Sequence, residues 1–327
     1  MTKAIHNSNF SSLGGHSVHE FRDSSYQEYR HCWEANPANF MVRDFPLHLD
    51  LETTSRCNLR CTFCDRRHLL TKEQIGDIDF SLFKKILDEC QGGRLWGLKL
   101  SYRGEPLLHP DLVEMVAYAK SKGILDVFFN TNGMLLTEEI SLRLMDAGLD
   151  RISVSVEGTD PVAYERERLG AKFLRILLNL DTLISLRLRK GYDRPRIRVQ
   201  TVEIPGLDLA EYKNFWLSHA DEVAAVSYQN TQERLEGLVC REWACPQLWQ
   251  RMTIAWNGAI MPCNNDDHGF LCVGNIKERS VSSCWHDPQV QQARKLHREG
   301  QSHLVQACNG CAWRSAQIHK LKPLPEG

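Results

Sequence analysis

The chain has 327 residues, enough for one large α/β domain and a smaller unit with a substantial apolar core. Its 40 Lys and Arg residues nearly balance its 41 Asp and Glu residues, so the charge gives no reason to expect nucleic acid or another polyanion as partner. No apolar run approaches the roughly 20 residues that span a bilayer, and the amino terminus lacks a signal-peptide core, which predicts a cytoplasmic protein without membrane contact.

Residues 1–45 are polar and mixed, with aromatic side chains on a stretch that could be helical. We expect this segment to be an N-terminal extension that forms a lid or wrap over the following domain. It is too short for an independent peptide-recognition domain. Its aromatic residues include Tyr26, Tyr29 and Trp33.

From residue 46 to about residue 235, strand and helix patterns alternate, which predicts a parallel sheet covered by helices. The predicted strands are 47–52, 95–101, 125–130, 151–156, 196–204 and 222–228. The predicted helices are 79–90, 111–122, 137–147, 172–188 and 208–219. Asp79, Thr137 and Asp208 occupy expected N-cap positions. Six such units form an incomplete barrel, in which chemistry gathers at the carboxyl ends of the strands.

The first predicted strand leads into Cys57-Asn-Leu-Arg-Cys61-Thr-Phe-Cys64. Three thiolates can hold three irons of a 4Fe–4S cluster and leave the fourth open for another ligand. Zinc, disulfides and buried structural thiols are the alternatives, but zinc sites usually consist of two CxxC-like pairs. The triad, with Phe63 before its third cysteine, resembles the signature of the radical S-adenosylmethionine (SAM) enzymes, where that aromatic residue packs near the adenine.

The second predicted strand ends in Arg103-Gly104-Glu105. A glycine at a strand end lets the backbone approach a ligand, and a carboxylate can bind an ammonium group. Taken alone, the segment could be an ordinary turn. After the cysteine triad it resembles the GGE motif of radical SAM enzymes, in which Gly104 and Glu105 would bind the amino group of SAM. Arg103 replaces the first glycine of that motif.

The next two strand ends complete the SAM pocket that the resemblance implies. Asn130 and Thr131 belong to a polar turn after the third strand, which lines this pocket in the family. Ser155, on the fourth strand, would hydrogen-bond SAM. Arg168 would lie near the SAM carboxylate, with Arg166 as a rival. A polar turn and ordinary surface arginines are the alternative interpretations.

A basic run follows the fourth unit. It consists of Arg187, Arg189, Lys190, Arg194, Arg196 and Arg198. We expect this run to form the solvated end of a helix and the start of the next strand. The alternative is a role in gripping a phosphate or a nucleotide-linked substrate.

Residues 236–327 break the alternating pattern, since cysteines, glycines and short segments dominate there. Four cysteines could saturate a second 4Fe–4S cluster or bind a structural zinc ion. They are Cys245, Cys263, Cys308 and Cys311. Their spacing resembles the shortened SPASM, or "twitch", module of radical SAM enzymes, which holds one auxiliary 4Fe–4S cluster. We therefore expect an α/β protein, a partial (β/α)6 radical SAM barrel with a C-terminal twitch/SPASM-like module.

The resemblance implies a SAM-binding 4Fe–4S cluster, an auxiliary 4Fe–4S cluster and SAM as cofactors, and a 5′-deoxyadenosyl radical that abstracts a hydrogen atom from the substrate. A fully ligated auxiliary cluster would accept an electron as a secondary alcohol is oxidised, as in 2-deoxy-scyllo-inosamine dehydrogenase-type enzymes. The expected substrate is a small polar molecule, namely a sugar, an aminocyclitol or a nucleotide-linked sugar. A flavodoxin or ferredoxin-type protein would donate the electron that cleaves SAM.

Other functions stay open. Cys240 or Cys272 could return a hydrogen atom to the substrate radical, which would make the enzyme an epimerase. The substrate could be a ribosomally made peptide, although neither a recognition domain nor cysteines for two auxiliary clusters are evident. The chain could also be a non-enzymatic iron–sulfur or zinc protein. Such a protein needs no SAM pocket, so Gly104 and Glu105 argue against it.

Overall fold

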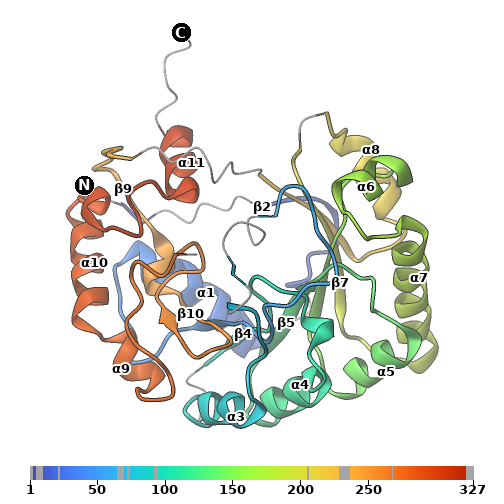
Figure 1. Ribbon diagram of the computed structural model, residues 1–327, viewed down its shortest axis with the longest axis horizontal. Helices are drawn as coiled ribbons and strands as arrows, with labels where there is room; N and C mark the ends of the chain where they lie inside the picture. The colour runs from blue at the N-terminus through green and yellow to red at the C-terminus, as the bar shows by residue number, and fades with distance from the viewer. Residues whose placement is uncertain are drawn as a thin grey trace.

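The computed structural model describes residues 3–4, 10–20, 23–64, 70–71, 74–91, 95–204, 206–227, 236–266 and 268–321. Within these residues the strands form a nine-stranded sheet of order β11-β10-β3-β4-β5-β6-β7-β8-β2 and a two-stranded sheet. Strands β3 to β8 are neighbours in chain order and are all parallel, as the alternating pattern predicts. The sheet curves into an incomplete barrel with helices on its outer side (Figure 1).

The six parallel strands coincide with the six predicted segments. They are β3 (His48–Leu51), β4 (Gly97–Lys99), β5 (Asp126–Thr131), β6 (Arg151–Ser155), β7 (Arg196–Val202) and β8 (Glu222–Val226). Only β5 extends past its predicted end, by one residue, and residue 228 of the last predicted segment lies outside the described residues. The agreement follows from runs of β-branched and aliphatic residues that are buried on the helix-covered face.

The helices between these strands also begin and end close to their predicted bounds. They are α3 (Phe80–Asp88), α4 (Leu112–Ser121), α5 (Glu138–Asp146), α7 (Phe173–Lys190) and α8 (Leu209–Trp216). The side chains of Asp79, Thr137 and Asp208 accept hydrogen bonds from backbone N–H groups of the first helical turn, so the three predicted N-caps are confirmed. The short helix α6 (Pro161–Glu167) was not predicted, because two turns are too few to show a helical period.

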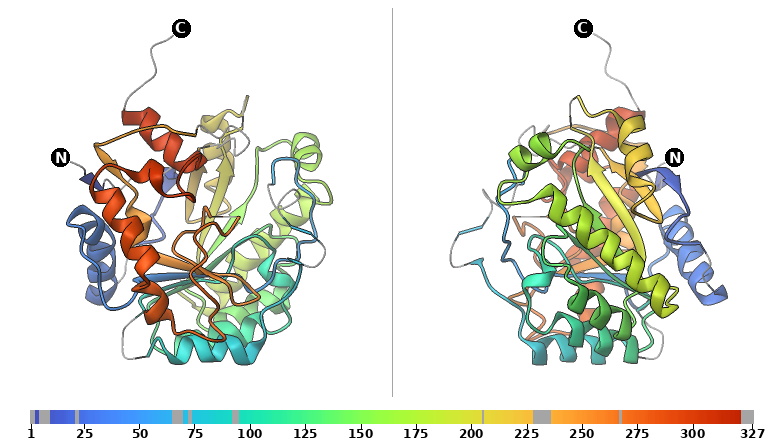
Figure 2. Two further views of the ribbon diagram at one scale, coloured as in Figure 1. Left: turned by 60° about the vertical axis from the view of Figure 1, so that its left-hand side comes forward. Right: turned by 90° about the vertical axis from the view of Figure 1, so that its right-hand side faces the viewer.

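The N-terminal segment closes the amino ends of the strands. Helix α1 (Ser24–Ala38) places Tyr29 and Trp33 in an apolar cluster with Leu47, which precedes β3, and with Trp96, which precedes β4. Strand β2 (Phe10–Gly15) pairs antiparallel with β8 and extends the sheet at that edge. Helix α1 therefore wraps the barrel at the end opposite to the carboxyl ends of the strands, rather than forming a lid over them (Figure 2).

The C-terminal segment joins the other edge of the same sheet. Strand β10 (Arg251–Ile254) pairs in parallel with β3, and β11 (Ile260–Met261) pairs antiparallel with β10. Strand β9 (Trp243–Ala244) pairs with β1 (Lys3–Ala4), and α9 (Val281–Trp285), α10 (Pro288–Arg298) and α11 (Ala312–Leu321) complete the segment. The segment therefore continues the sheet beside the strand that leads into the cysteine triad. The boundaries after residues 45 and 235 stay predictions.

The basic run is less solvated than its composition predicts. The guanidinium of Arg187 donates to both carboxylate oxygens of Asp221, and that of Arg198 donates to Glu222 at 2.8 and 3.0 Å. Both arginines are buried, at 8% exposure each. The expectation of a solvated run is therefore wrong for these two, because the carboxylates of Asp221, just before β8, and of Glu222, at its start, neutralise them inside the protein.

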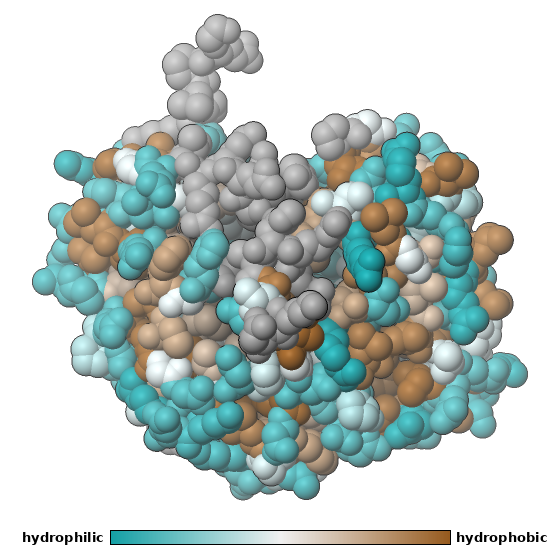
Figure 3. All heavy atoms as spheres, viewed as in Figure 1, coloured by the Kyte–Doolittle hydropathy of each residue, from teal (hydrophilic) through white to brown (hydrophobic). Residues whose placement is uncertain are grey.

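Hydrophilic side chains cover much of the outer rim on the face drawn in Figure 3, with hydrophobic ones interspersed. This distribution is expected for helices that turn an apolar stripe toward a parallel sheet. In the described part of the chain, no helix is both long and apolar enough to cross a membrane.

Candidate active site and auxiliary cluster site

The loop that carries the cysteine triad begins directly after β3 and is fixed by backbone hydrogen bonds to the last residue of α6 and to the segment after it. The N–H of Arg60 donates to the carbonyl of Leu169 at 2.9 Å. The N–H of Thr62 donates to the carbonyl of Glu167 at the same distance of 2.9 Å. These bonds hold the triad loop at the carboxyl ends of the parallel strands, where a barrel of this kind binds its ligands.

The three triad thiols lie close to one another. Burial raises the pKa of the Cys61 thiol to about 11; the positive charge of Arg168 opposes this rise, whereas the neighbouring thiols of Cys64 and Cys57 add to it. Cys61 is buried, while Cys57 and Cys64 are partly exposed. Three neighbouring thiols on one loop supply the type and number of donors that a 4Fe–4S cluster with one open iron requires.

Glu105 is buried beside the triad loop and is fixed by the turn after β5. Its Oε1 accepts a hydrogen bond from the hydroxyl of Thr131, and its Oε2 accepts one from the N–H of Asn132, each at 2.7 Å. Burial raises the pKa of Glu105, and these hydrogen bonds oppose the rise. These hydrogen bonds thus join the loop after β4 to the end of β5, the two segments that are predicted to line the SAM pocket.

The turn after β5 also touches the triad loop. The side-chain amide of Asn132 donates to Oδ1 of Asn58, the residue after the first cysteine, at 2.8 Å. The backbone N–H of Asn130 donates to the hydroxyl of Ser101 at 3.0 Å. Three strand-end loops, from β3, β4 and β5, are therefore connected by hydrogen bonds into one constellation.

Gly104 stands where the backbone passes very close to the triad loop. A Cβ atom on this residue would lie 2.1 Å from the carbonyl oxygen of Thr54 and 2.7 Å from that of Arg56. The N–H of Glu105 donates to the same Arg56 carbonyl at 2.7 Å. A glycine is required here because any side chain would push Glu105 away from the triad loop.

Arg168 forms a buried bidentate ion pair with Glu157. Its Nη2 donates to Oε1 of Glu157 at 2.8 Å, and its Nε donates to Oε2. The guanidinium carbon also lies 5.5 Å from the centre of the Phe63 ring, which places Arg168 beside the triad loop. The rival, Arg166, is exposed and pairs with Glu167 at 3.1 Å. Ser155 ends β6 and is partly exposed.

Sequence reasoning missed Glu52, the residue directly after β3. The guanidinium of Arg103 donates to both Glu52 oxygens, at 2.9 and 2.8 Å. The backbone N–H of Trp256, in the hairpin after β10, donates to Glu52 Oε2 at 3.2 Å. Arg103, which replaces the first glycine of the GGE motif, therefore links that motif to the C-terminal segment. The signal in the sequence that could have identified Glu52 was a carboxylate at the end of a predicted strand.

The inner, concave face of the barrel is polar and charged. Leu49 and Leu51 of β3 pack in the core under the helices, so the alternating residue Asp50 faces the inner side. Its carboxylate lies 3.0 Å from Arg251 and 3.8 Å from Lys99, both partly exposed. The three strands β3, β4 and β10 thus bring one acidic and two basic groups together inside the barrel.

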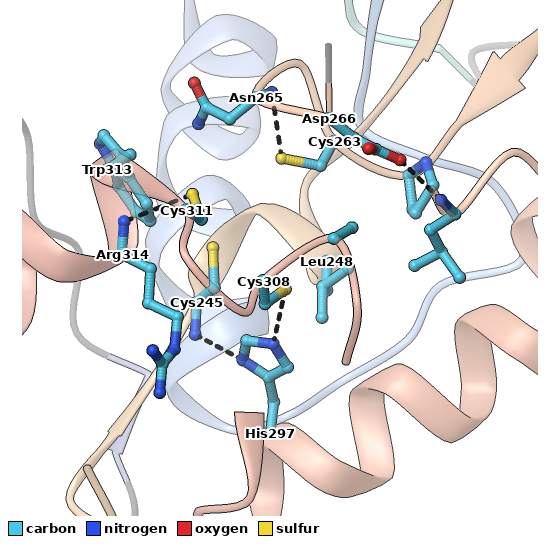
Figure 4. Close-up of a pocket in the computed structure, with 13 residues that line it drawn as sticks. Cys245, Leu248, Cys263, Asn265, Asp266, His297, Cys308, Cys311, Trp313 and Arg314 are labelled. Atoms are coloured by element: carbon cyan, nitrogen blue, oxygen red, sulfur yellow. Dashed lines mark hydrogen bonds between the residues drawn. The ribbon is translucent and has the colours of Figure 1, made fainter. Parts of the chain in front are cut away.

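The four C-terminal cysteines surround one pocket (Figure 4). They come from the end of β9, the turn after β11 and the turn before α11. Burial raises the pKa of the Cys245 thiol well above its ordinary value, and the thiols of Cys263, Cys308 and Cys311 add to the rise. Cys245 is buried and the other three cysteines are partly exposed. Four thiols around a shared cavity fit the donor set of a fully ligated 4Fe–4S cluster.

Other groups of this pocket hydrogen-bond the thiol sulfurs. The backbone N–H of Asn265 donates to Cys263 Sγ at 3.2 Å, and that of Arg314 donates to Cys311 Sγ at 3.5 Å. Among the described residues, no three His, Cys, Asp or Glu side chains converge as the ligands of one metal ion do. The four thiols instead line a cavity together with apolar side chains such as Leu248.

The structure does not bring the two candidate hydrogen donors together. Cys240 is buried in a cluster with Trp243, Cys245 and Ile318, beside the auxiliary site rather than on a barrel strand. Cys272 is exposed, and its thiol lies 3.5 Å from the carbonyl oxygen of Gly274. Their role as hydrogen donors stays a prediction.

Comparisons with known protein families agree with this geometry. Residues 51–208 match the radical SAM superfamily, and residues 245–312 match an iron–sulfur cluster-binding domain, SPASM. The chain thus carries a radical SAM domain and a C-terminal SPASM domain. These families bind 4Fe–4S clusters and SAM.

Three relatives illustrate the range of the family. The chain is 26% identical over 322 residues to the tungsten-containing aldehyde ferredoxin oxidoreductase cofactor-modifying protein of Pyrococcus furiosus, covering 82% of this chain and 88% of the relative. It is 26% identical over 309 residues to the PqqA peptide cyclase of Rhizobium meliloti, with 81% and 79% covered. A probable GTP 3′,8-cyclase of Methanococcus maripaludis is 33% identical over 154 residues, only 45% of this chain and 47% of the relative.

Solved structures share the fold over most of the chain. BtrN in complex with AdoMet and 2-DOIA has a TM-score of 0.53 at 20% identity, covering 81% of this chain and 93% of BtrN. Native anSMEcpe with bound AdoMet and Cp18Cys peptide has a TM-score of 0.60 at 12% identity, covering 84% of this chain and 95% of that chain. SuiB of Streptococcus suis bound to its precursor peptide SuiA has a TM-score of 0.59 at 16% identity, with 85% and 75% covered. Together with the family matches, they support a partial radical SAM barrel with a C-terminal SPASM-type module.

Arg168→Ala is expected to destabilise the protein by about 3–5 kcal/mol, because it leaves the buried Glu157 carboxylate without its partner. The matched control is Arg166→Ala, two residues earlier, whose exposed ion pair contributes at most about 1 kcal/mol. Urea-induced unfolding of both variants, under the same anaerobic conditions, measures the difference. Equal effects of the two substitutions would show that the Glu157 pair does not stabilise the fold.

Proposed function

We propose that the chain is a radical SAM oxidoreductase that oxidises a secondary alcohol carbon of a small polar substrate, with the auxiliary cluster as electron acceptor. The observation that carries this proposal is the four-cysteine pocket of Figure 4. Four thiolates leave no iron open for a substrate, so electron transfer is the role that remains for this cluster. Bound SAM and its own cluster would supply the radical that removes a hydrogen atom from the substrate.

The residues of the chain would bind and orient SAM at the carboxyl ends of the strands. Cys57, Cys61 and Cys64 would hold the cluster that binds SAM. Gly104 and Glu105 would receive its ammonium group, because the Glu105 carboxylate is already oriented by Thr131 and Asn132. The remaining proposed contacts to SAM are Phe63, Asn130, Thr131, Ser155 and Arg168.

The polar inner face of the barrel supports a polar substrate. Lys99 and Arg251 are partly exposed there and share the single carboxylate of Asp50. A sugar, an aminocyclitol or a nucleotide-linked sugar offers hydroxyl, amino or phosphate groups that such side chains bind. The similarity to BtrN, solved with AdoMet and 2-DOIA, spans most of both chains and gives further support.

The two proposed cofactor sites account for the hydrogen atom and the electron that the substrate loses in this oxidation. The substrate carbon gives up a hydrogen atom, the attached hydroxyl gives up a proton, and one electron passes to the auxiliary cluster, which leaves a ketone. A flavodoxin or ferredoxin-type protein is the proposed donor of the electron that cleaves SAM. We also propose that the protein acts in the cytoplasm.

A peptide substrate is the second candidate. It is favoured by the similarity to the PqqA peptide cyclase of Rhizobium meliloti over 81% of this chain. Two of the structures with the same fold, SuiB and anSMEcpe, were solved with bound peptides. A peptide maturase of this kind would keep the same SAM and auxiliary sites and would differ in what enters the barrel.

The test is anaerobic incubation of the reconstituted protein with SAM, dithionite and carbon-deuterated sugars, aminocyclitols and nucleotide-linked sugars. We expect deuterium in 5′-deoxyadenosine and a ketone product that has lost two hydrogens. A product that keeps its hydroxyl group, and in which a hydrogen from the solvent has replaced the abstracted deuterium, would instead indicate an epimerase, with Cys240 or Cys272 as hydrogen donor. Turnover of a peptide, with none of these small molecules consumed, would favour the second candidate.

A further inference from the structure

His297 lies between two of the four cysteines of the auxiliary site. It is carried by α10 and its side chain is fully buried, at 0% exposure. The backbone N–H of Cys245 lies 3.0 Å from Nδ1 of the imidazole, and Nε2 lies 3.3 Å from Sγ of Cys308. Both contacts are drawn in Figure 4, with the ring bridging the two cysteines. Sequence reasoning gave this histidine no role.

The first contact decides which nitrogen of the ring carries a proton. A backbone N–H can only donate, so Nδ1 must accept and therefore has no hydrogen of its own. A neutral imidazole then carries its proton on Nε2. The ring nitrogen that faces Cys308 is therefore a hydrogen-bond donor, and the sulfur of Cys308 is its acceptor.

A hydrogen bond of this kind changes the properties of an iron–sulfur cluster. Donors to ligand sulfurs stabilise the reduced cluster, which carries more negative charge, and so raise the reduction potential. Two other sulfurs of the site, those of Cys263 and Cys311, accept hydrogen bonds from backbone N–H groups. The bond to Cys308 comes from a side chain, so it can be removed without changing the backbone.

We propose that His297 is a positioning residue that holds an N–H donor on the Cys308 ligand and thereby raises the reduction potential of the auxiliary cluster. The inference rests on the proposed function, since it requires the C-terminal thiols to hold a cluster. A higher potential favours acceptance of the electron that the substrate releases. His297 would thus tune the electron acceptor without touching the substrate.

Two substitutions separate the contacts of the ring. In His297→Gln the side-chain amide nitrogen reaches about as far as Nε2, so the donor to Cys308 is kept. In His297→Asn the shorter side chain places an oxygen near the position of Nδ1, so the acceptor for Cys245 is kept and the donor is lost. The two variants therefore differ in the one hydrogen bond on which the inference depends.

The experiment measures the midpoint potential of the auxiliary cluster in the full-length chain with Cys57, Cys61 and Cys64 replaced by alanine, so that one cluster is observed. EPR-monitored redox titration should give a lower potential for His297→Asn than for the parent, and a potential close to the parent for His297→Gln. Equal potentials in all three proteins, with about four irons each, would overturn the role of His297 but leave the proposed function intact. The same downward shift in both variants would also overturn it, because packing would then be the cause.

A second measurement does not depend on the folding of the two His297 variants. Pulsed EPR of the reduced cluster in the parent chain, grown with ¹⁵N-histidine, should detect a coupled histidine nitrogen. No such coupling would overturn the inference. Absence of iron from the parent chain itself would overturn both the inference and the proposed function, since the four thiols would then hold no cluster.

Discussion

Replacing any one of Cys57, Cys61 and Cys64 by alanine is expected to reduce reductive SAM cleavage below detection. Three ligands are the minimum that can hold a 4Fe–4S cluster with one open iron, so each loss removes the site to which SAM binds. The three thiols lie on one loop that is held by backbone hydrogen bonds to the last residue of α6 and to the segment after it. The measurement is the amount of 5′-deoxyadenosine formed with dithionite under anaerobic conditions.

Cys32→Ala is the matched control for these variants. Cys32 lies on α1 in the apolar cluster at the amino ends of the strands, away from the triad loop. Loss of its thiol removes little buried apolar surface, so SAM cleavage should stay close to that of the unmodified chain. Wild-type cleavage by any one of the triad variants would contradict the assignment of the SAM-binding cluster.

The sequence predicted best what depends on neighbouring residues. The six parallel strands, five helices and three N-caps follow from side-chain period and from capping residues, which act within a few positions of the chain. The cysteine triad is likewise contiguous, so its spacing alone suggested a cluster. The loops of Gly104 and of Asn130 were placed in one pocket by the resemblance to radical SAM enzymes, which agrees with the rule that parallel strands end at one edge.

Contacts between distant residues could not be predicted in the same way. The choice between Arg166 and Arg168 depends on how α6 ends, since Arg168 leaves the helix and turns inward to Glu157. Arg187 is neutralised by Asp221, 34 residues further along the chain. Neither pair has a local sequence signal, because charged residues at such separations meet only after the strands have assembled.

The C-terminal module shows the same limit. Its four cysteines were found from spacing and from resemblance, but His297 lies in none of the cysteine segments and carries no motif. Its position is fixed by α10, which packs beside β9 and thereby brings the imidazole between Cys245 and Cys308. Groups that hydrogen-bond a cluster-binding cysteine are positioned by the packing of whole helices and strands, so they can be identified only in the structure.

The double variant Cys308→Ala/Cys311→Ala is expected to separate SAM cleavage from product formation. Loss of two of four thiolates should empty the auxiliary site, so that iron falls from about eight to about four atoms per chain. The triad loop is held by backbone hydrogen bonds to the last residue of α6 and to the segment after it, so some 5′-deoxyadenosine should still form. Ketone formation should stop, because the substrate radical would have no electron acceptor.

Cys284→Ala controls for the loss of a buried thiol in the same module. Cys284 is buried on α9 in the main core and does not line the four-cysteine pocket. The iron content of the Cys284→Ala variant should therefore stay near that of the unmodified chain. Iron and zinc are measured together in all three proteins. If the double variant kept all its iron, or lost zinc instead, the C-terminal thiols would hold no iron–sulfur cluster. Oxidation would then lack its electron acceptor, and the epimerase would become the favoured reaction, since a hydrogen atom returned from a thiol requires no acceptor.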